Sequence, residues 1–160
     1  MPPLETLHQL ITSESVASLA VLQEGSPLVT LVPYVVLWDP LRIYLLISDL
    51  SPHTAALRTD DRCSLLIHEP PQMGDPRSNH ALARTTLQGR ASFLVRREAV
   101  DLGVEALYRQ KYEIADMILG LADFHFCQIT PTTGTFIQGF GKAFQLQGSN
   151  LDQLQHLTGR

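Results

Sequence analysis

The stretch Ser48-Asp49-Leu50-Ser51-Pro52-His53-Thr54 has the residue types of an anion-binding site. Serine before proline is a common start of an α-helix, because serine caps the first turn and proline fits its first position. A helix start presents unpaired N–H groups and the positive end of the helix dipole, which attract phosphate. The hydroxyls of Ser51 and Thr54 and the imidazole of His53 can add contacts. On spacing alone, an ordinary helix cap is favoured over a phosphate site.

Two other short stretches could contact a ligand. Arg84-Thr85-Thr86, at the head of a long predicted strand, offers a cation and two hydroxyls, although a solvent-facing strand end would have the same composition. Gly139-Phe140-Gly141 lacks side chains at two positions, so its backbone could approach a ligand or a second chain closely. A β-bulge between two strands explains these glycines equally well. Neither stretch specifies a chemistry by itself.

The histidines do not form a metal-binding motif. None of the six stands in an HxH or HExxH pattern, so no metal site is predicted. The chain also lacks the GxSxG, Walker and GxGxxG motifs. Alternation of side chains along the predicted strand around His125 favours a structural role for that residue. The six histidines are His8, His53, His68, His80, His125 and His156.

The elements that would carry these residues are mostly short strands. A polar turn over residues 24–26 joins two of them as a hairpin. Pro33 in the second strand predicts an edge or a bulge, because proline cannot donate to a ladder. Strands are expected over residues 16–23, 28–36, 42–48, 62–68, 84–95, 124–130, 135–138 and 142–147. Helices are expected over residues 6–12, 51–60, 98–121 and 151–157, a turn over 131–134, and a long loop over 69–81. Within the third helix, one apolar face is expected to consist of Ile114, Met117, Ile118 and Leu121, and Gly103 is expected to interrupt the earlier turns.

This series of elements predicts a mainly β protein. Many strands with few, segregated helices are typical of a β-barrel with helical additions. A parallel α/β sheet would need regular alternation of strands and helices, which the first half of the chain lacks. A length of 160 residues fits one domain, so a single domain over residues 1–160 is expected.

Composition excludes several classes of function. Hydrophobic residues make up 44% and charged residues 18%, which is globular, and the formal net charge of −4 offers no basic surface for nucleic acid or an anionic membrane. Cys63 and Cys127 stand in apolar runs and form no CxxC pair, so buried free thiols are expected. With neither a signal peptide nor an apolar stretch of membrane-spanning length recognisable, a cytoplasmic protein is expected.

Three stretches together resemble a known family. They are residues 42–67, residues 82–91, and Asp123-Phe124-His125-Phe126 followed by Gly139-Phe140-Gly141-Lys142-Ala143. Their order resembles the FMN-binding split barrels, the pyridoxamine phosphate oxidase-like proteins, and within them the heme-utilisation branch of the HugZ and HutZ type. The resemblance covers nearly the whole chain. Its most specific part is the pairing of Asp-Phe with the later Gly-Phe-Gly.

The resemblance implies a six-stranded Greek-key barrel that forms a homodimer, with two FMN sites at the interface. Ser48, Ser51 and His53 match positions that hold the FMN phosphate in the oxidases, and Thr54 completes this expected phosphate shell. Arg84 belongs to the same shell and, with Thr85, matches an arginine–glutamine pair that reaches the flavin.

The sequence also departs from the oxidase pattern. The family's arginine on the second strand has no counterpart in residues 31–34. Pro52 and His53 replace arginine and lysine, and Thr85 replaces glutamine. A true pyridoxamine phosphate oxidase is therefore not expected.

Three functions follow from these comparisons of residues with the family. The first is an FMN-dependent oxidoreductase acting on an unidentified small substrate. The second is a heme-binding or heme-degrading protein, since the heme branch binds heme between subunits through a histidine in a C-terminal tail, aided by an aspartate that matches Asp123. His156 is the only histidine in the tail of this sequence. The third is a dimeric binding module without enzymatic activity.

Overall fold

The computed structural model describes residues 1–77 and 79–159, which fold into eight strands and five α-helices. The strands are β1 (Val16–Gln23), β2 (Ser26–Leu37), β3 (Arg42–Ser48), β4 (Arg62–His68), β5 (Arg84–Leu94), β6 (Phe124–Gly139), β7 (Lys142–Gln147) and β8 (Gln153–Leu157). The helices are α1 (Pro3–Ser13), α2 (Pro52–Thr59), α3 (Arg96–Asp101), α4 (Val104–Lys111) and α5 (Ala115–Leu119), with a short 3-10 turn, η1 (Asn79–Ala81), in the long loop. No helix in these ranges is long and apolar enough to span a membrane.

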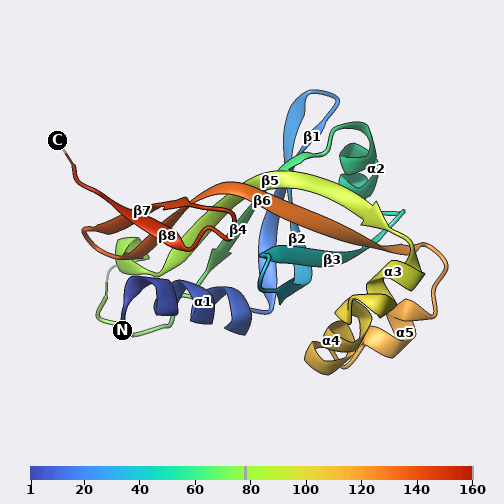
Figure 1. Ribbon diagram of the computed structural model, residues 1–160, viewed down its shortest axis with the longest axis horizontal. Coiled ribbons are helices and arrows are strands. Elements are labelled where there is room, and N and C mark those ends of the chain that lie inside the picture. The colour runs from blue at the N-terminus through green and yellow to red at the C-terminus, as the bar shows by residue number, and fades with distance from the viewer. Residues whose placement is uncertain (78, 160) are drawn as a thin grey trace.

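All eight strands belong to one antiparallel sheet. They pair in the order β3-β2-β1-β4-β5-β6-β7-β8, and an additional pairing of β3 with β6 closes the first six into a barrel. β7 and β8 extend the second half of β6 as a hairpin outside the closed barrel (Figure 1). The mainly β, six-stranded barrel expected from the sequence is confirmed.

The barrel interior is filled by side chains that alternate along the strands. On β5, Leu87 is buried and Phe93 packs against the same interior cluster. α1 adds Leu7, Leu10 and Ile11 to this cluster, and α2 adds Ala56 and Leu57. The two helices approach from opposite sides of the barrel (Figure 1). Each large aliphatic side chain buried in this way stabilises the fold by about 1.5–3 kcal/mol.

A second apolar cluster holds α3, α4 and α5 against the outer face of the barrel. β2, β3 and β6 supply its sheet side and the three helices the other, and its members are Val35, Tyr44, Leu46, Ala99, Val104, Tyr108, Ala115, Leu119 and Phe126. The helix expected over residues 98–121 is divided into three. The interruption expected at Gly103 is confirmed, because Gly103, at φ +78°, separates α3 from α4, but the second break, before α5, was not expected.

These breaks also overturn the apolar face expected for that helix. Ile114, Met117 and Leu121 are about half exposed, at 52%, 61% and 46%, whereas Ala115 and Leu119 are buried. α5 spans only Ala115–Leu119, so Ile114 and Leu121 lie outside the helix, and of the four expected residues Ile118 alone packs partly against the second cluster.

Pro33 ends the part of β2 that has a neighbouring strand on one side only, so the expected edge position is confirmed. β2 is hydrogen-bonded to β1 as far as Pro33, which pairs with Val16, and to β3 from Tyr34 onward. Proline therefore stands where the strand exchanges one partner for the other, and its missing N–H interrupts neither ladder. The next donor, Tyr34 N, is bonded to the hydroxyl of Tyr112 at 2.9 Å.

The C-terminal third differs most from expectation. β6 runs unbroken across residues 131–134, where a turn was predicted, and a register shift at Gln88 and Gly89 lies opposite Pro131. Residues 153–157, predicted as part of a helix, form β8 instead. A helix this short is marginally stable in isolation. As a strand, residues 153–157 form backbone hydrogen bonds with β7.

Candidate functional site

The junction between β3 and α2 is tied to the start of β6. Ser48 donates its hydroxyl to Asp123 Oδ2 at 2.7 Å and accepts the N–H of Leu50 at 3.0 Å. The N–H of Asp49 donates to the carbonyl of Asp123 at 2.8 Å. Two predicted site residues from different hypotheses, Ser48 for FMN and Asp123 for heme, are therefore brought into direct contact.

The start of α2 differs in detail from the predicted cap. Ser51 occupies the N-cap position, but its side chain makes no capping hydrogen bond. Instead Thr54 donates its hydroxyl to the carbonyl of Ser48 at 2.6 Å, and its N–H to the carbonyl of Ser51 at 3.0 Å. The Ser51 hydroxyl makes no hydrogen bond within the described part of the chain, so it remains available to a ligand.

His53 is buried, with 6% of its surface exposed, and only one ring nitrogen is bonded. Nδ1 lies 2.9 Å from the hydroxyl of Thr30 on β2. Nε2 is buried and has no partner among the described residues. Burial lowers the pKa of His53 below its usual value, so the ring is neutral at pH 7. A buried polar atom left unpaired costs about 1–3 kcal/mol, which a ligand atom or a water molecule can offset.

Arg84 and Thr85 lie far from this junction within one chain. On β6, Arg84 pairs with Ile137 and Ser48 with Phe124, near opposite ends of a strand of 16 residues. An extended strand of that length spans on the order of 50 Å. Thr85 is buried and donates its hydroxyl to the carbonyl of Thr135 at 2.9 Å. The structure therefore does not assemble the predicted FMN residues in a single chain.

Only one nitrogen of the Arg84 guanidinium makes hydrogen bonds to described residues. Nη1 donates to the carbonyls of His80 and Leu82 at 3.1 and 3.0 Å. The remaining N–H groups of Arg84 have no hydrogen bond within residues 1–77 and 79–159. This arginine can therefore present donors and a positive charge to a group outside its own chain.

His156 and Asp123 are separated in the same way. His156 lies on β8 opposite Phe144, with the two rings 5.2 Å apart, and Nε2 makes only a long contact of 3.4 Å to the carbonyl of Gly141. Asp123 precedes β6 at the other end of the barrel (Figure 1). Gly139-Phe140-Gly141 forms the β6–β7 connection, with Gly141 at φ +74°, and a tight turn accounts for its glycines.

Sequence reasoning missed Asp49 and Arg58, which meet His125 at the end of the barrel. His125 Nε2 lies 2.7 Å from one oxygen of Asp49, and Arg58 lies 3.6 Å from the other. The hydrogen bond with His125, together with the nearby Arg58 guanidinium, holds the pKa of Asp49 below its usual value. No local pattern could reveal this cluster, because Asp49 and His125 come from strands distant in sequence.

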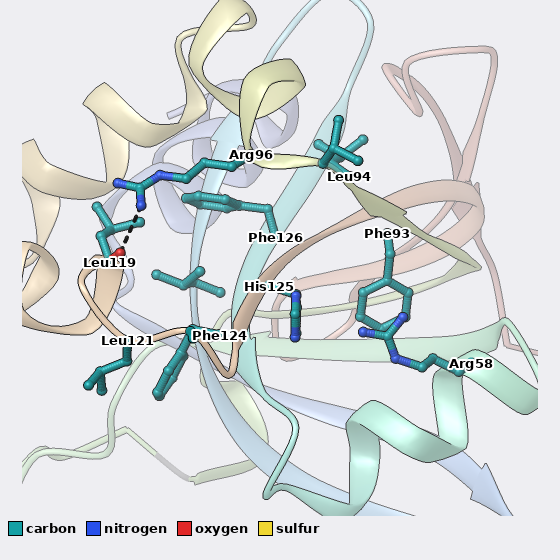
Figure 2. Close-up of a pocket in the computed structure, with 12 residues that line it drawn as sticks. Arg58, Phe93, Leu94, Arg96, Leu119, Leu121, Phe124, His125 and Phe126 are labelled. Carbon is teal, nitrogen blue, oxygen red and sulfur yellow. Dashed lines mark hydrogen bonds between the residues drawn. The ribbon is translucent and has the colours of Figure 1, made fainter.

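A cavity of about 550 Å³ opens beside this cluster (Figure 2). It lies between α2, the adjoining ends of β5 and β6, and the connection that follows α5. None of the residues predicted to hold FMN or heme lines it. The cavity is therefore distinct from the β3–α2 junction, although Asp49 joins the two through its neighbours Ser48 and His125.

Comparison with known proteins places the chain in a family. Residues 4–138 match the model of pyridoxamine 5'-phosphate oxidase. The chain belongs to the pyridoxamine 5'-phosphate oxidase family. The chain is 28% identical over 135 residues to the heme oxygenase HutZ of Vibrio cholerae. The aligned region covers 84% of this chain and 74% of HutZ.

Solved structures of the family share the fold. A heme-binding protein from Mycobacterium smegmatis superposes with a TM-score of 0.79 at 25% identity, over 95% of this chain but 60% of that longer one. The structure of Vibrio cholerae HutZ, described there as a heme storage protein, gives a TM-score of 0.71 at 22% identity and covers 82% of this chain and 91% of HutZ. The resemblance to the split barrels and to their heme-utilisation branch is thereby confirmed.

Proposed function

We propose that this protein binds heme at sites shared between two copies of the chain. The HutZ relative, similar over most of this chain, is a heme oxygenase by name, and the structural relative from Mycobacterium smegmatis is described as heme-binding. The residues predicted to bind FMN are split between opposite ends of the barrel, and so are those predicted to bind heme. Within one chain, neither cofactor could therefore contact all of its predicted residues.

The proposal rests on His156 as the ligand of the heme iron. Its imidazole stands on an exposed strand and has no strong hydrogen-bond partner among the described residues, so Nε2 is free to ligate iron. Neutral imidazole is a common axial ligand of heme. Bound heme would supply redox chemistry at iron, while the chain would supply the ligand and the enclosing surface. Asp123 of a second copy would lie near the ligand, held in place by Ser48.

A homodimer is part of the proposal. On the outer face of the barrel, Leu31 and Val29 of β2 are 67% and 65% exposed. Small residues lie directly beside them on β1, Ser18 opposite Leu31 and Ala20 opposite Val29. A flat apolar area of this kind on a sheet suits contact with an identical area of a second copy.

Titration with hemin tests the proposal. Wild-type protein is expected to give a saturable Soret band, and His156→Ala to change its position and to weaken binding by at least about tenfold, a loss of about 1.4 kcal/mol. His8→Ala, which removes a histidine of α1 whose ring lies 4.2 Å from that of Trp38, is the matched control and should bind as wild type. Equal hemin spectra and affinities for all three proteins would reject His156 as the ligand.

FMN is the second candidate, and His53 favours it. The buried Nε2 of His53 and the hydroxyl of Ser51 have no hydrogen-bond partner among the described residues, so both are available at the start of α2 as donors to a phosphate. Against this, Asp49 and Asp123 place carboxylates beside the junction, and the only predicted cation, Arg84, would come from a second copy. FMN binding would make the protein a flavin-dependent oxidoreductase on a small substrate.

A parallel fluorescence titration with FMN separates the two candidates. If FMN is the ligand, its fluorescence is quenched saturably, and Arg84→Ala weakens binding by about 1.5–3 kcal/mol through loss of a charge-assisted hydrogen bond. Hemin binding without FMN binding selects the heme proposal. Binding of neither would leave a dimeric binding module as the remaining function.

A further inference from the structure

The cavity beside α2 has apolar walls with one polar corner. Leu46, Leu94 and Phe126 line it from the barrel and are largely buried. Leu121 and Phe124 close the side that follows α5, and Phe93 stands across from them (Figure 2). An interior of this kind, with a few converging polar groups, is typical of a small-molecule site.

Arg58 forms the polar corner. Its orientation is fixed, but most of its N–H groups have no acceptor among the described residues. Its guanidinium lies over the ring of Phe93, 4.1 Å from the centroid, and this stacking fixes its plane (Figure 2). Its one charged neighbour, Asp49, is 3.6 Å away and is held more closely by His125 at 2.7 Å. Within the described part of the chain, the 3.6 Å contact with Asp49 is the shortest polar contact of Arg58, so most of its N–H groups are available to a bidentate acceptor.

The second arginine at the cavity, Arg96, already has acceptors within the chain. Arg96 donates to both carboxylate oxygens of Glu105, at 3.0 and 3.2 Å, and to the carbonyl of Leu119 at 2.9 Å. One open guanidinium among apolar walls suits a single carboxylate on a ring better than a phosphate, which would need more cationic contacts. His125 completes the corner, since Asp49 fixes one ring nitrogen and leaves Nδ1 without a partner in residues 1–77 and 79–159.

We propose that this cavity binds a small aromatic carboxylate, with the acid group on Arg58 and the ring enclosed between Phe93 and the wall formed by Leu121 and Phe124. None of the residues assigned to heme or FMN lines the cavity, although Asp123 stands between two residues that do, Ala122 and Phe124. The inference goes beyond the proposed function and does not depend on which cofactor is bound.

Calorimetric titration with two matched probes tests the inference. 2-Naphthoate carries the required carboxylate, and 2-naphthol has the same ring system without it. Wild-type protein is expected to bind 2-naphthoate at least about tenfold more tightly, because only the acid can form the bidentate contact. Arg58→Met, which keeps an apolar chain over Phe93, should abolish that difference while leaving 2-naphthol binding unchanged.

Two further variants locate the binding. Arg97→Met removes a neighbouring exposed arginine that pairs with Asp101 and does not line the cavity, so it should bind 2-naphthoate as wild type. Leu94→Trp fills the cavity and should weaken both probes. Circular dichroism and the thermal midpoint confirm that each variant is folded.

Several results would overturn the inference. Equal affinity for the two probes, undiminished 2-naphthoate binding by Arg58→Met or by a folded Leu94→Trp protein, or no binding at millimolar probe would each reject the site. Displacement of 2-naphthoate by saturating hemin or FMN would show that the cavity belongs to the cofactor site. Unchanged 2-naphthoate affinity in the presence of both cofactors supports a separate site.

Discussion

The imidazole of His53 is held with one ring nitrogen bonded to Thr30 and the other buried without a partner among the described residues. Its pKa is lowered by burial, because the charged ring would lose hydration that nothing nearby replaces. At the scale of single residues, His53 is therefore a buried neutral imidazole whose Nε2 can still pair with a ligand atom or a water molecule.

The lowered pKa predicts an acid-sensitive contribution to stability. The unfolded chain takes up a proton on this ring near the usual pKa of about 6.5, whereas the folded chain does so only at lower pH. The contribution of His53 to the free energy of unfolding is therefore complete above about pH 6.5 and is lost as the pH falls toward the folded pKa. Denaturant unfolding should show a smaller decline between about pH 7 and 5 for His53→Asn than for wild type.

An exposed histidine supplies the control for that measurement. His68 lies on the outer face of β4 and is exposed, so His68→Asn should keep the wild-type decline. An identical pH dependence of wild type and His53→Asn would show that His53 does not titrate differently in the folded state.

The residue types at the β3–α2 junction could be identified from sequence, but their partners could not. Ser-Pro correctly located the start of α2, because both residues act through the local backbone. That Thr54 rather than Ser51 supplies the hydrogen bond there depends on where the carbonyl of Ser48 lies. The Asp49–His125 contact joins β3 to β6, and its existence depends on strand pairing that spacing along the chain does not encode.

At the scale of elements, β5 and β6 approach each other at Gly89 too closely to admit a side chain. A Cβ atom at Gly89 would lie 2.2 Å from the carbonyl oxygen of Thr130, which is backbone and cannot move aside. Gly89→Ala is therefore expected to lower the free energy of unfolding by about 1–3 kcal/mol or more, as overpacked interiors do. Chemical denaturation measures the change.

Gly120 is the matched control for this substitution. It ends α5 in a helical conformation, and an added Cβ would make only ordinary contacts, the nearest at 3.4 Å. Gly120→Ala should change the free energy of unfolding by no more than about 0.5 kcal/mol. A similar small effect at Gly89 would mean that β5 and β6 are able to separate there.

The elements themselves were predicted well where one pattern extended over a whole strand. The first four strands and α2 were located from alternation, turn residues and the Ser-Pro pair. Errors appeared where an expected breaker did not break, as at Pro131, or where an unexpected break divided a helix, as between α4 and α5. A bulge in β6 accommodates its missing N–H, because Thr132 is left between Pro131 and Thr133 with no partner in the β5 register.

At the scale of the whole molecule, the exposed face of β2 predicts self-association. Leu31→Asp places a charge in the proposed apolar contact, where burial without a partner is costly. Light scattering should give a dimer for wild type at micromolar concentration and a monomer for Leu31→Asp. Val100→Asp, at a half-exposed position on α3, is the control and should remain dimeric. A monomeric wild-type protein would remove the shared-site proposal.

The division of each predicted cofactor site between the two ends of the barrel has a consequence for how ligand binding is measured. If each site needs one end from either copy, ligand occupancy and dimer formation are linked by mass action. Apparent affinity will then fall as the protein is diluted toward its dimer dissociation constant, and added ligand will draw monomers together. In that case, a dissociation constant for heme or FMN has meaning only when the protein concentration is stated with it.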